Sequence, residues 1–248
     1  MQPLDNAEDR MNLLLTKSAD GDLYLTWMLS GLVWTLTLWI TAGVLAYSIG
    51  IVNGCLRVST NRYLRLVGRV YVQVFRNVPL LVQAFLWYFV LPEVLPQAAG
   101  DWIKQIAPPW ASFVPAVLAL SLFTAARISE QVRAGLNTLP LGQASASSAL
   151  GLSPLQTYLS ILLPQALRVA LPTLTTEALG LLKNTSVGLT IGLMELTAQA
   201  QQINEFTFKT FQAFGCVTVI YLVIALSIHQ AAFLIERRVR VPGLRTGQ

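Results

Sequence analysis

Long apolar stretches separated by short clusters of charge dominate this chain. No charged side chain occurs between residues 23 and 56, and a second apolar region covers roughly 70–91. Three more regions follow at about 112–130, 169–193 and 211–235. A helix of about 20 residues crosses the hydrocarbon core of a bilayer, so each region is long enough to span it. The pattern therefore predicts about five transmembrane helices.

The composition also indicates that lipid is the main solvent of the chain. Of its 248 residues, 54% are hydrophobic and only 12% are charged, with a mean hydropathy of +0.57. Soluble domains carry about a quarter charged residues. A chain in hydrocarbon must satisfy its backbone internally, and the short alternating segments of a membrane β-barrel do not occur here. We therefore predict one all-α integral membrane domain over residues 23–236.

The distribution of basic residues predicts the orientation. If the five spans alternate in direction, one side holds eleven arginines, namely Arg57, Arg62, Arg65, Arg69, Arg127, Arg133, Arg168, Arg237, Arg238, Arg240 and Arg245. The other side holds four basic residues, namely Arg10, Lys17, Lys104 and Lys209. Cytoplasmic loops carry the excess of Lys and Arg. We therefore place segment 1–22 outside the cytoplasm and the tail 237–248 inside it. The net charge of +5 reflects this topology and does not indicate a nucleic-acid partner.

The polar segment 140–168 separates the third and fourth apolar regions. Small residues fill positions 143–150, which predicts a short helix that ends at Gly151. Ser153, followed by a proline and then by Gln156, is typical of a capping box that starts a second helix. The segment is therefore predicted to form a cytoplasmic helical hairpin.

The surface of this hairpin carries no charge between residues 143 and 165. Leu155, Leu159 and Leu162 are predicted to line one side of the second helix and to pack on the bundle, and Pro164 to end or kink that helix. Helices that lie on a membrane surface usually carry Lys or Arg on their polar face. We therefore interpret the hairpin as a docking element for another protein. The alternative is an interfacial helix that only covers the ends of the spans.

The hairpin resembles the cytoplasmic coupling loop of ATP-binding-cassette importer permeases. The matching positions are Gly142-Gln143, Ala146, Leu150-Gly151, Ser153 and Ile161-Leu162-Leu163-Pro164, whereas Ser145 stands where the family has a glutamate. The fragments YVQVFRNVPLLVQAF (71–85) and LLKNTSVGLTIGLMELTAQAQ (181–201) are similar to the polar amino-acid uptake branch of that family. The fragments are most similar to those of glutamate/aspartate permeases.

The resemblance implies a type I importer permease fold in a bacterial inner membrane. It implies a partner ATPase dimer, a second and distinct permease subunit and a periplasmic substrate-binding protein. The chain has no G-x-x-x-x-G-K-[ST] loop, so we expect no cofactor on this chain, no enzymatic activity, and ATP with Mg²⁺ on the ATPase. The residues expected to contact the ATPase are Gly142, Gln143, Ser145, Ala146, Ala149, Gly151, Ser153, Ile161 and Pro164.

Polar residues at membrane depth are candidates for the substrate pathway, because such residues are costly there. The set comprises Arg76, Asn77, Gln83, Glu177, Lys183, Asn184, Thr185 and Ser186. In an amino-acid permease, Lys183 would bind the substrate carboxylate and Glu177 its ammonium group. The alternative is that Lys183 extends to the interface and that the charged residues pair structurally.

Arg127, Glu130 and Arg133 lie at three-residue intervals on one predicted helix, so we expect Glu130 to pair with both arginines. Neither the two cysteines nor His229 has a neighbour at metal-ligand spacing, and no metal site is predicted. Three other functions stay open from the residues: a permease for a basic or amide amino acid, a membrane assembly subunit, and a membrane enzyme.

Overall fold

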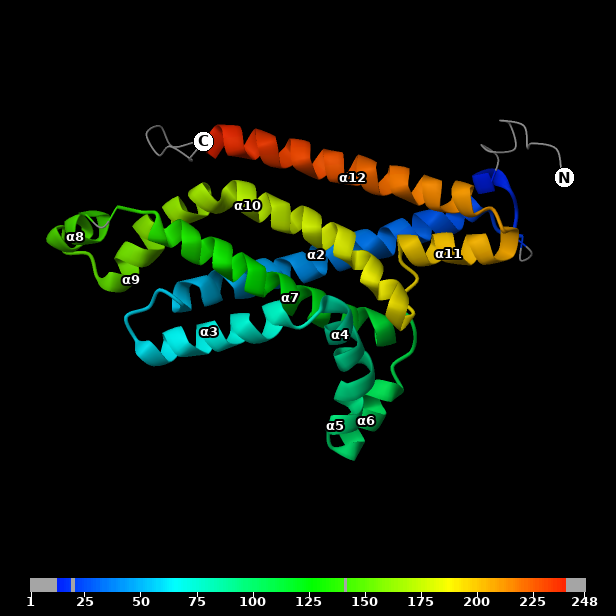
Figure 1. The fold of residues 1–248 in the computed structure, drawn as a ribbon, viewed down its shortest axis with the longest axis horizontal. Helices are drawn as coiled ribbons and strands as arrows, with labels where there is room; N and C mark the ends of the chain where they lie inside the picture. The colour runs from blue at the N-terminus through cyan, green and yellow to red at the C-terminus, as the bar shows by residue number, and fades with distance from the viewer. Residues whose placement is uncertain (1–12, 19–20, 141, 240–248) are drawn as a thin grey trace. The chain divides into compact units, whose positions relative to one another are not determined.

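The computed structural model describes residues 13–18, 21–140 and 142–239. Regular structure in this part of the chain is helical, as predicted (Figure 1). Each predicted apolar region overlaps a helix of 16 or more residues, in order α2 (Tyr24–Leu56), α3 (Arg62–Asn77), α7 (Trp110–Asn137), α10 (Leu163–Asn184) and α12 (Thr210–Val239). Most of the predicted outer segment 1–22, and Arg240 and Arg245 of the tail, lie outside the described residues.

Three of the described helices are long and apolar enough to cross a membrane, namely α2, α7 and α12, with 33, 28 and 30 residues. A fourth candidate is a broken span that combines α3 with the helical segment Leu80–Val94. Helix α10 has 22 residues but includes Arg168, Glu177 and Lys183, which lower its hydropathy. Its apolar character is therefore weaker than the sequence pattern of region 169–193 predicted, and its helix ends at Asn184.

The second predicted span is not one continuous helix. Helix α3 ends at Asn77, Val78 is extended (φ −85°, ψ 127°), and α4 (Leu80–Phe85) begins after Pro79. A residue that precedes proline avoids the helical region because the proline ring clashes with its backbone. The predicted second span is therefore broken at this dipeptide.

Two wide helical turns precede prolines and keep the helix running through them. The π-helical turns Leu86–Val90 and Tyr158–Leu162 lie before α5 (Leu91–Val94) and before α10, respectively. In the second turn the Leu163 N–H donates to the Tyr158 carbonyl, and Pro164 follows. The extra residue relieves the contact that a proline ring otherwise makes with the preceding turn. Of the two predicted effects of Pro164, an end or a kink of the helix, the end is therefore wrong.

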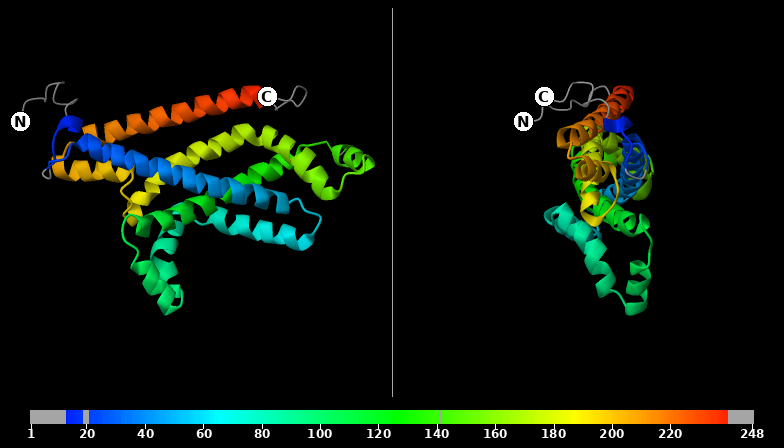
Figure 2. Two further views of the ribbon diagram at one scale, coloured as in Figure 1. Left: turned by 180° about the vertical axis from the view of Figure 1, so that it is seen from behind. Right: turned by 90° about the vertical axis from the view of Figure 1, so that its right-hand side faces the viewer.

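The chain divides into two units, and α2 and α7 contribute residues to both. Unit 1 comprises Met1–Ala42, Leu80–Leu120 and Leu182–Leu226, and unit 2 comprises Gly43–Pro79, Ser121–Leu181 and Ser227–Gln248. In unit 1, helices α2, α11 (Leu196–Thr207) and α12 share a core that includes Met28, Leu196, Ile203 and Val217. Short helices α5 and α6 (Gln97–Lys104) pack side by side (Figure 2), and Lys104 forms an ion pair with Glu93.

A buried carboxylate fixes the start of α11 in unit 1. Glu195 is fully buried and accepts hydrogen bonds from the N–H groups of Thr197 (3.0 Å) and Ala198 (2.9 Å). The Tyr221 hydroxyl donates to the same carboxylate at 3.0 Å, and the Thr35 hydroxyl lies 3.4 Å away. Glu195 thereby connects α2, α11 and α12, a role that the sequence analysis did not predict.

In unit 2, the C-terminal part of α2 and helix α3 pack against α7 and α10. Its core consists of Ala46, Ala125, Ile128, Val132, Ala170 and Leu174. Two tyrosines bridge helices across it: the Tyr47 hydroxyl donates to the Leu174 carbonyl (2.6 Å), and the Tyr71 hydroxyl donates to that of Leu122 (2.9 Å). Small core side chains and these bridges hold the four helices that carry the candidate sites.

Candidate functional site

The first half of the hairpin ends as the sequence predicts. Helix α8 spans Gly142–Ala149, and Gly151 has a left-handed backbone (φ +79°). The N–H groups of Gly151 and Leu152 donate to the carbonyls of Ser148 (3.0 Å) and Ser147 (3.1 Å). This is the Schellman arrangement, in which glycine is favoured because a Cβ atom is strained in that conformation.

The second half of the hairpin starts with the predicted capping box. The Ser153 hydroxyl accepts from the Gln156 N–H, the Gln156 side chain accepts from the Ser153 N–H, and Pro154 is the first residue of α9 (Pro154–Thr157). At the base of the hairpin, Gln143 donates to the side chain of Gln165 at 2.9 Å. Local hydrogen bonds therefore define both the tip and the base.

The apolar side chains of the hairpin are more exposed than predicted. Leu150, Leu155 and Leu159 are 81%, 67% and 55% exposed, whereas Leu162 is half-buried. The π turn adds a residue between Leu155 and α10, which rotates the two leucines relative to Leu162. The prediction that all three pack on the bundle is therefore wrong. The hairpin lies at the ends of α7 and α10 (Figures 1 and 2).

Segment 143–165 of the hairpin also stays neutral over a wide pH range. Burial raises the pKa of the Tyr158 hydroxyl above its ordinary value, so this group keeps its proton even in mildly alkaline solution. Because segment 143–165 has no other ionisable side chain, the surface that carries the exposed leucines has no charge that pH can change.

A second site in unit 2 forms around Glu130 of α7. Arg57 Nη2 donates to Glu130 at 2.8 Å, Arg133 donates through Nε and Nη2 at 3.1 Å each, and Arg76 Nη1 lies 3.5 Å away. The predicted pairing of Glu130 with Arg133 is confirmed. The pairing with Arg127 is wrong, because Arg127 Nε donates at 2.7 Å to the buried carboxylate of Glu177 on α10.

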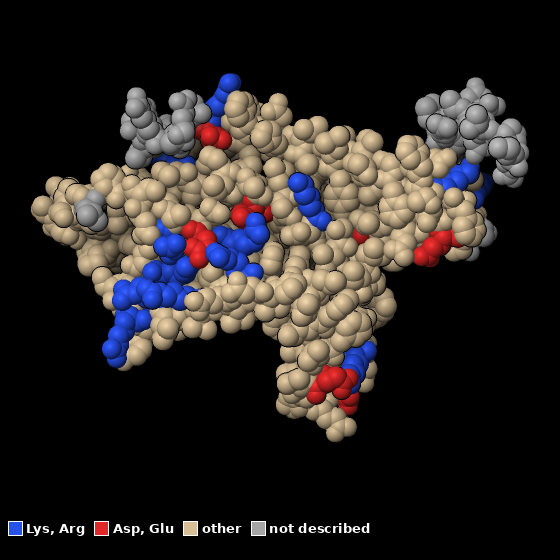
Figure 3. All heavy atoms as spheres, in the orientation of Figure 1, with Lys and Arg blue, Asp and Glu red and all other residues tan. Residues whose placement is uncertain are grey.

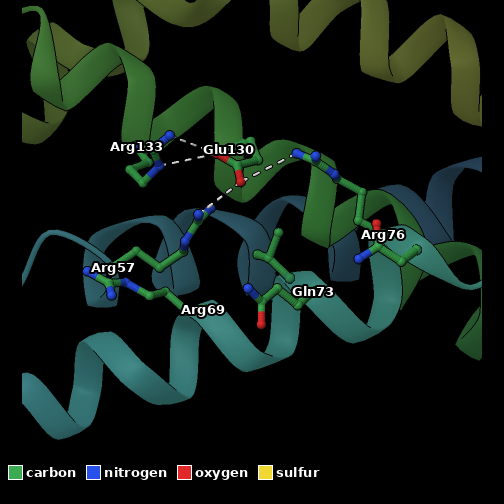
Figure 4. Close-up of a pocket in the computed structure, with 8 residues that line it drawn as sticks. Arg57, Arg69, Gln73, Arg76, Glu130 and Arg133 are labelled. Carbon is green, nitrogen blue, oxygen red and sulfur yellow. Dashed lines mark hydrogen bonds and ion pairs between the residues drawn. The ribbon is translucent and has the colours of Figure 1, made fainter.

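A cavity of about 300 Å³ lies beside Glu130. Arginines from α3, α7 and the residue after α2 line it, together with amide side chains (Figure 4). The residues labelled there are Arg57, Arg69, Gln73, Arg76, Glu130 and Arg133. Basic side chains gather over α3 and the adjoining part of α7, around a few carboxylates (Figure 3). Four arginines against one glutamate leave three positive charges in excess.

The spacing of basic residues in α3 explains the cavity. Arg62, Arg65, Arg69 and Arg76, with Gln73, follow at intervals of three, four or seven residues, which places them on one face of a helix. A different face is apolar and exposed, through Val67, Val70 and Val74. Gly68 permits close packing, since a Cβ atom there would lie 2.7 Å from Arg57 Cγ. The sequence analysis used Arg57 and Arg69 only for orientation, and Arg133 for orientation and for pairing with Glu130. It therefore missed these three arginines and Gln73 as lining residues.

The predicted pathway residues are divided between the two units. In unit 2, Arg76 and Asn77 line the cavity, whereas Glu177 is paired with Arg127. In unit 1, Gln83 is buried on α4 and Lys183 is exposed at the end of α10. Asn184 precedes the 3₁₀ turn Thr185–Ile191. The hydroxyls of Thr185 and Ser186 donate to the carbonyls of Leu182 and Lys183 (2.7 and 2.9 Å).

Comparison with known proteins identifies the family. Residues 40–241 match the family described as "Binding-protein-dependent transport system inner membrane component". The chain belongs to this family. It is 42% identical over 226 residues to the glutamate/aspartate import permease protein GltJ of Escherichia coli strain K12, covering 91% of this chain and 92% of that protein. It is 33% identical over 208 residues to the probable amino-acid permease protein YxeN of Bacillus subtilis, with 84% and 89% covered.

Solved structures of other transporters share the fold. The crystal structure of an amino acid ABC transporter with histidines matches with a TM-score of 0.73 and 30% identity, over 87% of this chain and 95% of that one. A MetNI methionine transporter chain matches at 0.69 with 23% identity. The family assignment makes this chain an inner-membrane permease subunit of an ABC importer with the type I fold, a transport component whose ATPase is a separate subunit.

Proposed function

We propose that this chain is the permease subunit of an importer for glutamate and aspartate, coupled to its ATPase through the hairpin 140–168. The named activity of the 42% identical relative supports the substrate, since other relatives named for arginine or glutamine uptake are 32% and 29% identical. A permease for a basic or amide amino acid is the second candidate.

The observation that carries the coupling role is the neutral, locally fixed hairpin with its exposed leucines. Leu150, Leu155 and Leu159 offer apolar area to a protein groove, and the Schellman and capping-box bonds hold their backbone. We assign the contact to Gly142, Gln143, Ser145, Ala146, Ala149, Gly151, Ser153, Ile161 and Pro164 together with these leucines. ATP and Mg²⁺ then bind the ATPase dimer, whose closure would move unit 2 through the hairpin.

The proposed assembly contains a second, distinct permease chain and a periplasmic binding protein, with the N-terminus outside the cytoplasm and the C-terminus inside. The proposed pathway positions are Arg76 and Asn77 of the cavity together with Gln83, Glu177, Lys183, Asn184, Thr185 and Ser186.

Topology can be tested with a single cysteine at position 150 in a chain lacking Cys55 and Cys216. An impermeant thiol reagent should label it only after the cells are opened, and labelling of intact cells would refute this orientation.

The transport proposal is tested by reconstituting the permease with its partners in vesicles and measuring uptake of radiolabelled glutamate. Uptake should require ATP and the binding protein, and unlabelled aspartate should compete whereas arginine and glutamine should not. ATP-driven uptake of arginine or glutamine in place of glutamate would favour the second candidate. Uptake without any ATPase would refute the importer assignment.

The docking role is tested with substitutions of exposed leucines, which leave the folded chain intact. Leu155→Gln and Leu159→Gln should reduce co-purification of the ATPase and lower ATP-driven uptake. Leu15→Gln is the matched control, because Leu15 is also exposed (63%) but lies in unit 1, in the predicted outer segment. Equal retention of the ATPase by all three variants would show that the hairpin does not carry the contact.

A further inference from the structure

The arginine-lined cavity of unit 2 is short of negative charge. Glu130 forms ion pairs with Arg57, Arg133 and Arg76, so one carboxylate contacts three guanidinium groups. Arg69, the fourth arginine of the lining, forms no ion pair with any described residue. The site thus has donors that no acceptor of the described chain uses.

The lack of acceptors is clearest at Arg57, which is buried. Its side chain is only 9% exposed, and its Nε and Nη1 atoms have no hydrogen-bond acceptor among the residues that the structure describes. Buried polar groups in proteins are nearly always hydrogen-bonded, and an unpaired buried charge is costly. A buried guanidinium that Glu130 satisfies through one nitrogen only leaves excess positive charge beside the cavity, which favours an anionic ligand there.

The residue types favour carboxylates. Guanidinium groups bind planar oxyanions through paired N–H donors, and four of them line this cavity, from α3, α7 and the residue after α2 (Figure 4). Gln73 and Asn77 add amide groups to the same wall. The volume of about 300 Å³ lies at the small end of the range for ligand pockets, which suits a molecule of the size of an amino acid.

We propose that this cavity binds the acidic amino acid itself, with its two carboxylates on the arginines. This inference rests on the proposed function, and it assigns the binding site mainly to residues that the sequence analysis did not select. A dicarboxylate offsets the excess charge, whereas the neutral amide analogue leaves one carboxylate position unfilled. The same arginines would accept the phosphate of an anionic lipid or free phosphate, so the test must separate these sources.

The test is equilibrium binding of radiolabelled glutamate to the complete permease–ATPase complex, purified without the binding protein and placed in nanodiscs. Arg69→Gln and Arg76→Gln each remove a charged donor from an exposed position. We expect each to weaken binding by about tenfold or more, because a hydrogen bond to a charged group is worth about 1.5–3 kcal/mol. Arg76→Lys, which keeps the charge but loses the paired donors, should fall between Arg76→Gln and the wild type.

Arg62→Gln is the matched control, since Arg62 lies on α3 but outside the cavity lining and contacts Tyr63. It should bind glutamate as the wild type does, and all variants should unfold at similar temperatures. Aspartate should compete with glutamate, whereas glutamine and inorganic phosphate should not. Binding should also be equal in nanodiscs of phosphatidylcholine alone and in nanodiscs with added phosphatidylglycerol.

Several results would overturn the assignment. They are equal binding by Arg69→Gln, Arg76→Gln and Arg62→Gln, competition by glutamine or phosphate, or loss of binding when phosphatidylglycerol is added. Transport separates this inference from the proposed function. If wild-type vesicles take up glutamate and the cavity variants keep both their binding and the wild-type KM, only the cavity assignment fails. If wild-type vesicles do not take up glutamate at all, the proposed function itself fails.

Discussion

The pairing of Arg57 with Glu130 allows a quantitative prediction for the stability of unit 2. Their side chains are 9% and 23% exposed, and Nη2 lies 2.8 Å from Oε1. Removing one partner of a fully buried ion pair costs about 3–5 kcal/mol, and an exposed pair contributes about 0–1 kcal/mol. Because Arg57 is buried and Glu130 is partly exposed, we expect Glu130→Gln to cost about 2–4 kcal/mol.

The same reasoning predicts that Arg57→Met relieves most of this cost. Without the buried guanidinium, Glu130 still has Arg133 and Arg76, so Arg57→Met alone should cost only about 1 kcal/mol. In the double variant no buried charge is left unpaired. Its stability should therefore lie close to that of Arg57→Met, with a coupling free energy of about 2–4 kcal/mol.

Thermal unfolding of the purified protein in detergent measures these changes. A thiol-reactive dye reports unfolding through Cys55 and Cys216, which are free and partly buried. For a chain of this size, Glu130→Gln should lower Tm by about 5–15 °C. Arg62→Gln, an exposed substitution on α3, should change it by less than about 2 °C. Additive effects of Arg57→Met and Glu130→Gln, within about 0.5 kcal/mol, would refute the argument.

Three further substitutions test other features. Gly151→Val should weaken ATPase binding about 5–30-fold in a titration, because a β-branched residue at φ +79° costs about 1–2 kcal/mol. Gly151→Asn should bind the ATPase nearly normally, and wild-type affinity of the valine variant would contradict the prediction. Glu195→Ala should lower Tm by several degrees, because it removes the α11 cap and the hydrogen bond from Tyr221. Substitution of the exposed Glu205 by Ala is the control, and an equal effect of both substitutions would exclude the capping role of Glu195. Phe208→Gly should raise the free energy of unfolding by about 1 kcal/mol, because Phe208 has a left-handed backbone (φ 54°) and is 88% exposed. A lower Tm of this variant would show that the Phe208 ring makes stabilising contacts.

The parts of the fold that depend on local chemistry were predictable. The Gly151 turn and the Ser153 capping box follow from residues within a few positions of each other, and both formed as the sequence indicated. The breaks were harder to assign. Val78-Pro79 interrupts a helix, whereas Pro164 does not, because a π turn precedes it. Hydropathy alone does not distinguish these two outcomes.

The candidate site depended on contacts between distant residues. Sequence spacing correctly placed Arg133 beside Glu130, one turn apart on α7. It assigned Arg127 to the same carboxylate, since nothing local shows that α10 brings the buried Glu177 to within 2.7 Å. The cavity itself had a signal in the sequence, the arginine face of α3. That signal indicates which face of α3 is polar. The cavity itself forms because this face lies beside Arg57 and Glu130, which the spacing within α3 does not show.

The π turn Tyr158–Leu162 joins the hairpin to α10 without a hinge, so its single extra residue sets the rotation of the hairpin about the helix axis. Deleting one residue there would restore regular α-helical geometry and turn the leucine-bearing tip by about 100°. The membrane-embedded helices would keep their sequence and packing. A change of one residue in length could thus alter which ATPase surface the permease fits while leaving the transport pathway unchanged.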